Sequence, residues 1–274
     1  RRTDMRLKAV TVSAGISAAP YAARNVKELM ENVDLAVYHV KHNGKNGIQV
    51  FDMMFRNNSD GNNTRNRTHI YQEYESTIYA LTAAIDAKDH YTFSHSNNVA
   101  YYATSLATTL GMNEDMIEII RQAALLHDVG KIGIPEYILN KEGKLTDEEY
   151  EIIKGHVEAS IDIIRHLPSL DYVIPAVIGH HERYDGKGYP RRIAGEDIPL
   201  TARILCVADS FDAMTSKRCY KKAFPIEVAR EKLLQDAGRQ FDPDLVYKFV
   251  ECLDNGSITL VKAEETVDNL KEML

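Results

Sequence analysis

Residues 123–135 read AALLHDVGKIGIP, in which apolar residues at helical spacing end on the adjacent pair His127 and Asp128. Other side chains that can bind metals also lie on the apolar faces of expected helices: His95, His156, the doublet His180 and His181, and Asp209. The pattern predicts that several helices point polar side chains into one apolar interior.

The spacing of apolar residues predicts an almost wholly helical chain from about residue 68 onward. Helices are expected at 68–87, 95–110, 114–128, 146–166, 169–181, 200–216, 225–237, 242–254 and 263–273. Thr146 followed by Glu149 is the pattern of a capping box. Gly111 suits a helix end, and Asn113 suits the cap of the next helix.

The first 52 residues follow a different pattern. Residues 8–18 alternate and are rich in β-branched side chains, residues 25–42 have helical spacing, and residues 47–51 are typical of a short strand. The Asn-rich segment 53–67 has few large apolar residues and is interpreted as a linker. We therefore expect a small α/β fragment at 1–52 and a helical domain at 68–274.

Composition limits the classes of function. The net charge of −7 argues against a broad surface for a nucleic-acid polymer, so any positive charge that binds a phosphate must be local. Three widely spaced cysteines, Cys206, Cys219 and Cys252, fit neither a disulfide framework nor a thiolate zinc site and predict a reducing, cytoplasmic location. The sequence has no apolar run of about 18 residues and no signal-peptide pattern at its start.

The buried histidines and carboxylates together predict a metal site. One histidine on an apolar face is more often a hydrogen-bonded core residue, but burying the whole set without a cation would cost several kcal/mol per unpaired charge. Nitrogen and oxygen ligands without thiolates suit iron, manganese, cobalt, nickel or zinc better than calcium. The adjacent pairs at 127–128 and 180–181 are natural bridges between two ions. Two such ions can clamp a phosphate oxygen and share an activated water, which indicates a hydrolase.

Four motifs in this order resemble the HD-GYP branch of the HD phosphohydrolase superfamily. They are HDVGKIGIP, KGHVEAS, HHERYDGKGYP and ADSFDAMTSKRCY, with Gly188, Tyr189 and Pro190 as the signature tripeptide. The resemblance extends from about residue 70 to residue 255. It implies a helical bundle that hydrolyses cyclic di-GMP to linear pGpG, or further to GMP, by metal-activated water.

The resemblance also implies the ligands of two divalent ions, with Asp128 bridging them. The first ion would be held by His95, His127, Asp128 and Asp209, and the second by His156, His180 and His181. Iron or manganese is expected, with zinc, nickel and cobalt left open. Family members with three ions carry a glutamate where this chain has Tyr91, so we expect two. Ser94 and Asn98 replace a usual glycine and arginine.

Roles in catalysis and substrate binding follow from the same resemblance. Lys131 would neutralise charge or donate a proton beside the phosphate, while Asp89 and Asp212 would orient that lysine or the ligands. Substrate contacts are expected from Gly188, Tyr189, Arg183, Arg218 and Lys221. Without the neighbouring ligands, the glycine-rich loop would be interpreted as an ordinary connection, and the last two residues as a solvated helix end.

The amino-terminal fragment resembles the closing strand, helix and strand of a GGDEF domain. The matching stretches are VTVSAGIS and NVKELMENVDLAVYHVKHNGKNGIQVF. The signature loop and the metal-binding aspartate of that fold are missing, so this fragment cannot synthesise the messenger. Its apolar helix face suggests docking on the helical domain, on a second copy of the chain or on a GGDEF-domain partner.

Two alternatives to a cyclic di-GMP hydrolase remain. One is a receptor that binds the cyclic dinucleotide without turnover, against which the intact ligand set argues. The other is an HD hydrolase of a different nucleotide or of a hybrid cyclic dinucleotide, because guanine selectivity depends on side chains that the sequence does not place. Turnover with added manganese or iron separates these alternatives.

Overall fold

The structure is a computed structural model that describes residues 12–17, 26–42, 48–50, 75–85, 88, 92–216 and 223–261. The chain divides into two compact units, Arg1–Tyr74 and Glu75–Leu274. The expected linker at 53–67 and the expected helix at 263–273 lie outside the described residues. The domain limits drawn from the sequence therefore stay predictions.

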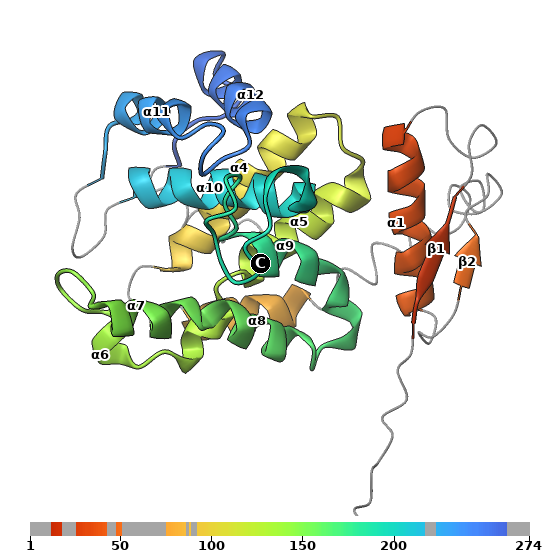
Figure 1. Cartoon of the computed structure of the whole chain (residues 1–274), viewed down its shortest axis with the longest axis horizontal. Helices are drawn as coiled ribbons and strands as arrows, with labels where there is room; N and C mark the ends of the chain where they lie inside the picture. Colours follow the sequence, from red (N-terminus) through yellow and green to blue (C-terminus); the bar gives the residue numbers. More distant parts are fainter. Residues whose placement is uncertain are drawn as a thin grey trace, which may run out of the picture. The chain divides into compact units, whose positions relative to one another are not determined.

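The first unit contains a strand–helix–strand element. Strand β1 (Ala14–Ile16) pairs in parallel with β2 (Ile48–Val50), and α1 (Val26–His42) connects them in sequence. Figure 1 shows α1 beside β1. The approach is so close that a Cβ at Gly15 would lie 2.5 Å from the carbonyl oxygen of Val33. The predicted order of elements is confirmed.

The second unit is helical throughout its described residues, apart from turns and one isolated bridge. After the helical residues 75–85 come α4 (Thr92–Thr109), α5 (Glu114–Leu126), η1 (Val129–Gly133), α6 (Glu136–Leu139), α7 (Asp147–Lys154), α8 (His156–Ile164), η2 (Pro168–Val173), α9 (Ile174–Gly179), η3 (Gly195–Asp197), α10 (Leu200–Thr215), α11 (Ile226–Gln235) and α12 (Pro243–Asp254). The predicted mainly α fold is confirmed. No helix among the described residues is long and apolar enough to cross a membrane.

Helix α4 lies at the centre of the core, where it packs against α5, α10 and α12 (Figure 1). Tyr102, Phe211 and Phe249 bring one aromatic ring each from α4, α10 and α12. Their rings meet edge to face, with centroids 5.0–6.3 Å apart. Such pairs contribute about 0.5–1.5 kcal/mol beyond burial. This packing fixes α4 and α10, two of the helices that carry predicted ligands.

Helix caps agree with the sequence, but two helix lengths do not. Thr146 and Glu149 form the predicted capping box, and Asn113 accepts the backbone N–H of Met116. The single helix predicted at 146–166 is wrong, because α7 ends before Gly155 and α8 begins after it. The helix predicted at 169–181 is 3-10 up to Val173, and α-helical only over Ile174–Gly179. Glycine weakens a helix, and proline removes a backbone donor.

Segment η1 packs directly on α8 through Gly130. A Cβ at Gly130 would lie 2.0 Å from the carbonyl oxygen of His156 and 2.4 Å from the backbone nitrogen of Ser160. The backbone N–H of Gly130 donates to the Ser160 hydroxyl at 2.8 Å, and that hydroxyl donates to the carbonyl oxygen of His127 at 3.0 Å. This contact joins the two chain segments that carry His127 and His156.

We predict that Gly130→Ala destabilises the helical unit by about 1–3 kcal/mol, because the added methyl group meets backbone atoms that cannot move alone. Gly133→Ala is the matched control in the same 3-10 helix, since nothing lies within 4 Å of its Cβ position. It should stay within about 0.5 kcal/mol of the parent. Denaturant unfolding measures both variants, and equal stabilities would contradict the close contact.

Candidate metal centre

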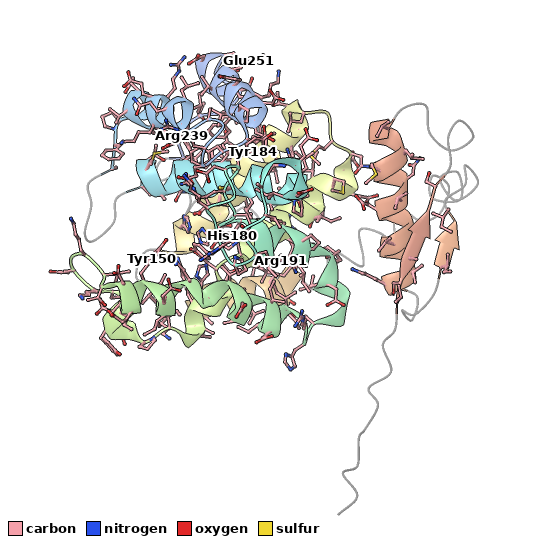
Figure 2. The ribbon with its side chains drawn as sticks, viewed as in Figure 1. Tyr150, His180, Tyr184, Arg191, Arg239 and Glu251 are labelled. Atoms are coloured by element: carbon pink, nitrogen blue, oxygen red, sulfur yellow. The ribbon has the colours of Figure 1, made fainter. Side chains whose placement is uncertain are left out.

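The predicted ligands lie on or directly after five helices, α4, α5, α8, α9 and α10, and meet in one place. His127 follows the last residue of α5, His156 begins α8, and His180 follows the last residue of α9. Three overlapping groups have ligand atoms within 4.8 Å of one another. They are His156, His180 and His181; His95, His127 and Asp209; and His127, Asp128 and His180. Figure 2 shows ring nitrogens gathered near His180, within the helical unit.

Three of the imidazoles are oriented by the backbone of their own helical turn. The Nδ1 atoms of His127, His156 and His180 donate to the carbonyl oxygens three residues earlier, at 2.5–2.6 Å. Because a carbonyl oxygen only accepts, Nδ1 carries the proton and Nε2 presents a lone pair. All three Nε2 atoms are buried without a hydrogen-bond partner. A buried acceptor of this kind is costly unless something positive lies against it.

His95 is oriented by a carboxylate. Its Nδ1 donates to Asp212 Oδ2 at 2.6 Å, and Asp212 Oδ1 accepts from Asn98 Nδ2 and Ser216 Oγ at 2.9 Å each. This leaves Nε2 of His95 facing Asp209 Oδ1 at 3.3 Å. Asp212 therefore holds a predicted ligand. Asn98, which replaces an expected arginine, supports that carboxylate.

Asp128 faces two groups of histidines with its two oxygens. Its Oδ2 atom lies 3.2 Å from His127 Nε2 and 3.8 Å from His95 Nε2, whereas Oδ1 lies 3.3 Å from His156 Nε2. The turn of η1 brings Lys131 Nζ to 2.6 Å from Oδ2. Burial raises the pKa of Asp128, but the positive charge of Lys131 opposes burial, and the pKa lies well below the usual value. Asp128 is therefore ionised between the two groups.

The imidazoles of His156, His180 and His181 are neutral. Burial, with His156 nearby, lowers the pKa of His181 to about 3, and burial also lowers the pKa values of His156 and His180. At His95, burial lowers the pKa, but Asp209 and Asp212 outweigh it and raise the pKa to about 9. One side of the centre thus offers neutral nitrogen ligands, and the other favours a positive charge.

The residues present fit divalent transition metals. The centre offers three lone pairs without partners, an ionised Asp128, and Asp209, whose pKa is lowered by His95 despite burial. Neutral imidazoles and carboxylates without a thiolate are the ligands of such ions. The orienting partners on the far side of each ring are those found around metal-bound histidines.

The loop after the histidine doublet folds back on it. A Cβ at Gly188 would lie 2.3 Å from the backbone nitrogen of Arg183 and 2.6 Å from the carbonyl oxygen of His181, so only glycine fits. Tyr189 donates its backbone N–H to that same oxygen at 3.2 Å, and its ring stacks on the His181 ring with centroids 4.8 Å apart. Arg183 forms a bidentate pair with Asp185, at 3.0 and 2.8 Å.

Glu182 is a buried residue that the sequence did not single out. Its Oε1 accepts the backbone N–H groups of Arg191 and Arg192 at 2.6 and 3.1 Å, while Oε2 is buried without a partner. A carboxylate directly after the ligand doublet was the available signal. Gly130 and Ser160 were also missed. Three predicted residues, Asp89, Arg218 and Lys221, lie outside the described residues.

Comparison with known proteins agrees with this geometry. Residues 80–245, more than half of the chain, match the family model described as HD domain. The chain is 41% identical to the 3′3′-cGAMP-specific phosphodiesterase 2 of Vibrio cholerae, over 65% of this chain and 34% of that protein. It is 40% identical to the cyclic di-GMP phosphodiesterase response regulator RpfG of Xanthomonas campestris pv. campestris, over 65% of this chain and 47% of that protein. The chain thus spans half or less of these relatives.

A solved structure has a similar fold. It is Bd1817, a HDG"Y"P protein from Bdellovibrio bacteriovorus, with a TM-score of 0.50 and 21% identity. The match covers 58% of this chain and 51% of that one. At this identity the likeness concerns the fold alone.

We predict that His156→Ala lowers metal content, because it removes one of the partnerless Nε2 atoms. Partners that only orient a ligand are worth about 10–100-fold in metal affinity, so loss of a ligand itself should cost at least as much. His166→Ala is the matched control: His166 also bonds a backbone carbonyl through Nδ1, at 2.7 Å, but is exposed. Elemental analysis after loading with manganese measures both variants, and equal metal content would exclude His156 as a ligand.

Proposed function

Because this chain belongs to the HD domain family, we propose that it is a metal-dependent phosphodiesterase that hydrolyses cyclic di-GMP to linear pGpG, or further to GMP. One observation carries the proposal. Three buried imidazole nitrogens without partners face an ionised Asp128 that carries a lysine at 2.6 Å. The name of RpfG supports cyclic di-GMP as the substrate.

We assign two metal ions to the centre. One would be held by His95, His127, Asp128 and Asp209, and the other by His156, His180 and His181, with Asp128 shared. The two oxygens of Asp128 face different histidines, which supports its role as a bridge. Such ions, when bound, polarise a phosphodiester and lower the pKa of a bound water. Iron or manganese is proposed; Tyr91, on which the count of two depends, lies outside the described residues.

Lys131 is assigned to stabilising the phosphate and its leaving oxygen. Its ammonium is held at 2.6 Å by Asp128 and is therefore placed beside any phosphate at the centre. There it neutralises charge that develops on the phosphate or gives a proton to the leaving oxygen. Asp212 holds His95, and Asp89 is proposed to act in the same orienting manner.

Substrate binding is assigned to the loop after the doublet and to two basic residues that follow α10 in the sequence. Gly188 places the loop against His181, and the stacked ring of Tyr189 offers a surface near the centre for a guanine base. Arg183 is proposed to contact the nucleotide, although Asp185 now pairs with it. Arg218 and Lys221 are proposed to supply further positive charge.

A second candidate substrate is a hybrid cyclic dinucleotide. The observation that favours it is that the Vibrio cholerae relative is named as specific for 3′3′-cGAMP. Both substrates have two phosphodiesters and differ in one purine base, so the same ligands and Lys131 would serve either. A receptor that binds without turnover is the remaining alternative, and the complete set of donors speaks against it.

The setting of the enzyme belongs to the same proposal. The HD-GYP assignment rests on the motif around Tyr189, and the strand–helix–strand unit at the amino terminus is proposed to be part of a GGDEF domain. That unit would dock on a second copy or on a GGDEF-domain protein. A cytoplasmic location is supported by Cys206 and Cys252, which are free and buried.

The test of this function is turnover by the whole chain. Protein purified anaerobically and loaded with manganese or iron should convert cyclic di-GMP to pGpG. Chromatography of the products measures this conversion. Parallel incubations with 3′3′-cGAMP determine which purines are accepted. Binding of cyclic di-GMP without any product would favour the receptor. The absence of both binding and turnover would overturn the proposal.

We predict that Lys131→Ala lowers kcat by about 10²–10⁴-fold while metal content is kept, the range for a positioned acid or a group that stabilises developing charge. Lys141→Ala is the control, because Lys141 also pairs with a carboxylate, that of Glu149 at 2.6 Å, away from the centre. Steady-state kinetics and elemental analysis are made on both variants. Unchanged kcat in Lys131→Ala would remove this lysine from the mechanism.

A further inference from the structure

Lys154, the last residue of α7, holds its ammonium between two aromatic rings. Its Nζ atom lies 4.7 Å from the ring centroid of Tyr150 and 5.6 Å from that of Tyr189. Tyr150 is one turn earlier on the same helix, whereas Tyr189 comes from the loop after the histidine doublet (Figure 2 labels Tyr150 and His180). An ammonium within about 6 Å of a ring centroid is attracted by the ring face.

This cation lies next to the metal centre. Tyr189 stacks on His181, a predicted ligand, with ring centroids 4.8 Å apart. Two residues after Lys154 the chain reaches His156, another predicted ligand. The ring of Tyr189 therefore contacts both Lys154 and a predicted ligand histidine.

The pairing of Lys154 differs from that of Lys131 and Arg183. Lys131 pairs with buried Asp128, and Arg183 pairs through two hydrogen bonds with Asp185. Lys154 pairs at 2.5 Å with Glu151, whose side chain is 70% exposed. Exposed ion pairs contribute little, because water competes for both charges. An anionic ligand can therefore replace Glu151 at low cost.

The two rings position the ammonium without neutralising it. A free lysine side chain loses rotamer entropy when it binds, and packing against aromatic faces removes part of that loss beforehand. A positioned positive charge near the ligands suits a substrate with two phosphates in a chain whose net charge is −7. One phosphate belongs at the metal centre, which leaves the other for a cation at its edge.

We infer that Lys154 is a further substrate-binding residue, whose ammonium, held between Tyr150 and Tyr189, pairs with the phosphate of the cyclic dinucleotide that is not being cut. This inference rests on the proposed function. It places the remote phosphate on the α7 side of the centre. Tyr150 acts by positioning the ammonium, and Tyr189, proposed above as a surface for a base, borders it.

The experiment compares kcat and KM for cyclic di-GMP in metal-loaded protein. Lys154→Ala should raise KM about tenfold with a smaller change in kcat, because the contact is made both before and during bond cleavage. Lys154→Arg should recover most of the affinity, since a guanidinium also pairs with phosphate and stacks on rings. Calorimetric binding in the slow Lys131→Ala background should show the same loss of affinity when Lys154→Ala is added.

Lys248→Ala is the matched control, because Lys248 forms an equivalent ion pair three residues from Glu251, at 3.0 Å, on the distant helix α12. It should leave KM unchanged. Unaltered KM and affinity in Lys154→Ala would overturn the inference. An equal loss of activity toward cyclic di-GMP and bis(p-nitrophenyl) phosphate would also overturn the inference, because it would show a structural role. A loss of bound metal would do the same. Failure of the proposed function is separate, since the unmodified protein would then neither bind nor hydrolyse cyclic di-GMP.

Discussion

The burial of Asp128 is the constraint on which the helical unit depends. A carboxylate removed from water must be matched by positive charge or by donors, or it takes up a proton. Here Lys131 supplies the charge from the next turn, and its contact keeps Asp128 ionised in a centre where burial keeps His156, His180 and His181 neutral. The centre therefore has an anion at its middle and lone pairs at its edge. That distribution of charge is unfavourable in an apolar core without a cation and favourable for binding metal cations.

The helices serve this centre mainly with their ends. His127 and His180 occupy positions just after the last residues of α5 and α9, where the helix dipole favours a positive charge. At such a position the ring can reach the carbonyl oxygen three residues back, so the helix itself sets the tautomer. His95 lies within α4 and depends on Asp212 of α10 instead. The geometry of the candidate metal centre therefore depends on helix packing.

Much of this could be predicted from the sequence, because the ligands share one physical signature. Each lies on an apolar face, so helical periodicity alone brings His95, His127 and Asp209 into one interior. Helical periodicity gave a wrong helix length at Gly155. The apolar spacing continues past this residue, and only the backbone shows that α7 ends before it. Periodicity also gave no signal for Glu182, which acts on backbone N–H groups. Contacts to backbone leave no pattern in spacing, and the positions of Asp89, Arg218 and Lys221 stay predictions.

The contacts that hold the loop over His181 limit how its sequence can vary among relatives. Glu182 holds the backbone at 191–192, and Gly188 lies against the backbone at 181–183, so both ends of the loop are tied to the ligand doublet. Changes of loop length there would alter the centre itself. The turn before α7 is different, since Gly143 is exposed with open space around it. Variation between relatives should therefore appear as point changes in the loop over His181 and as insertions in the turn before α7.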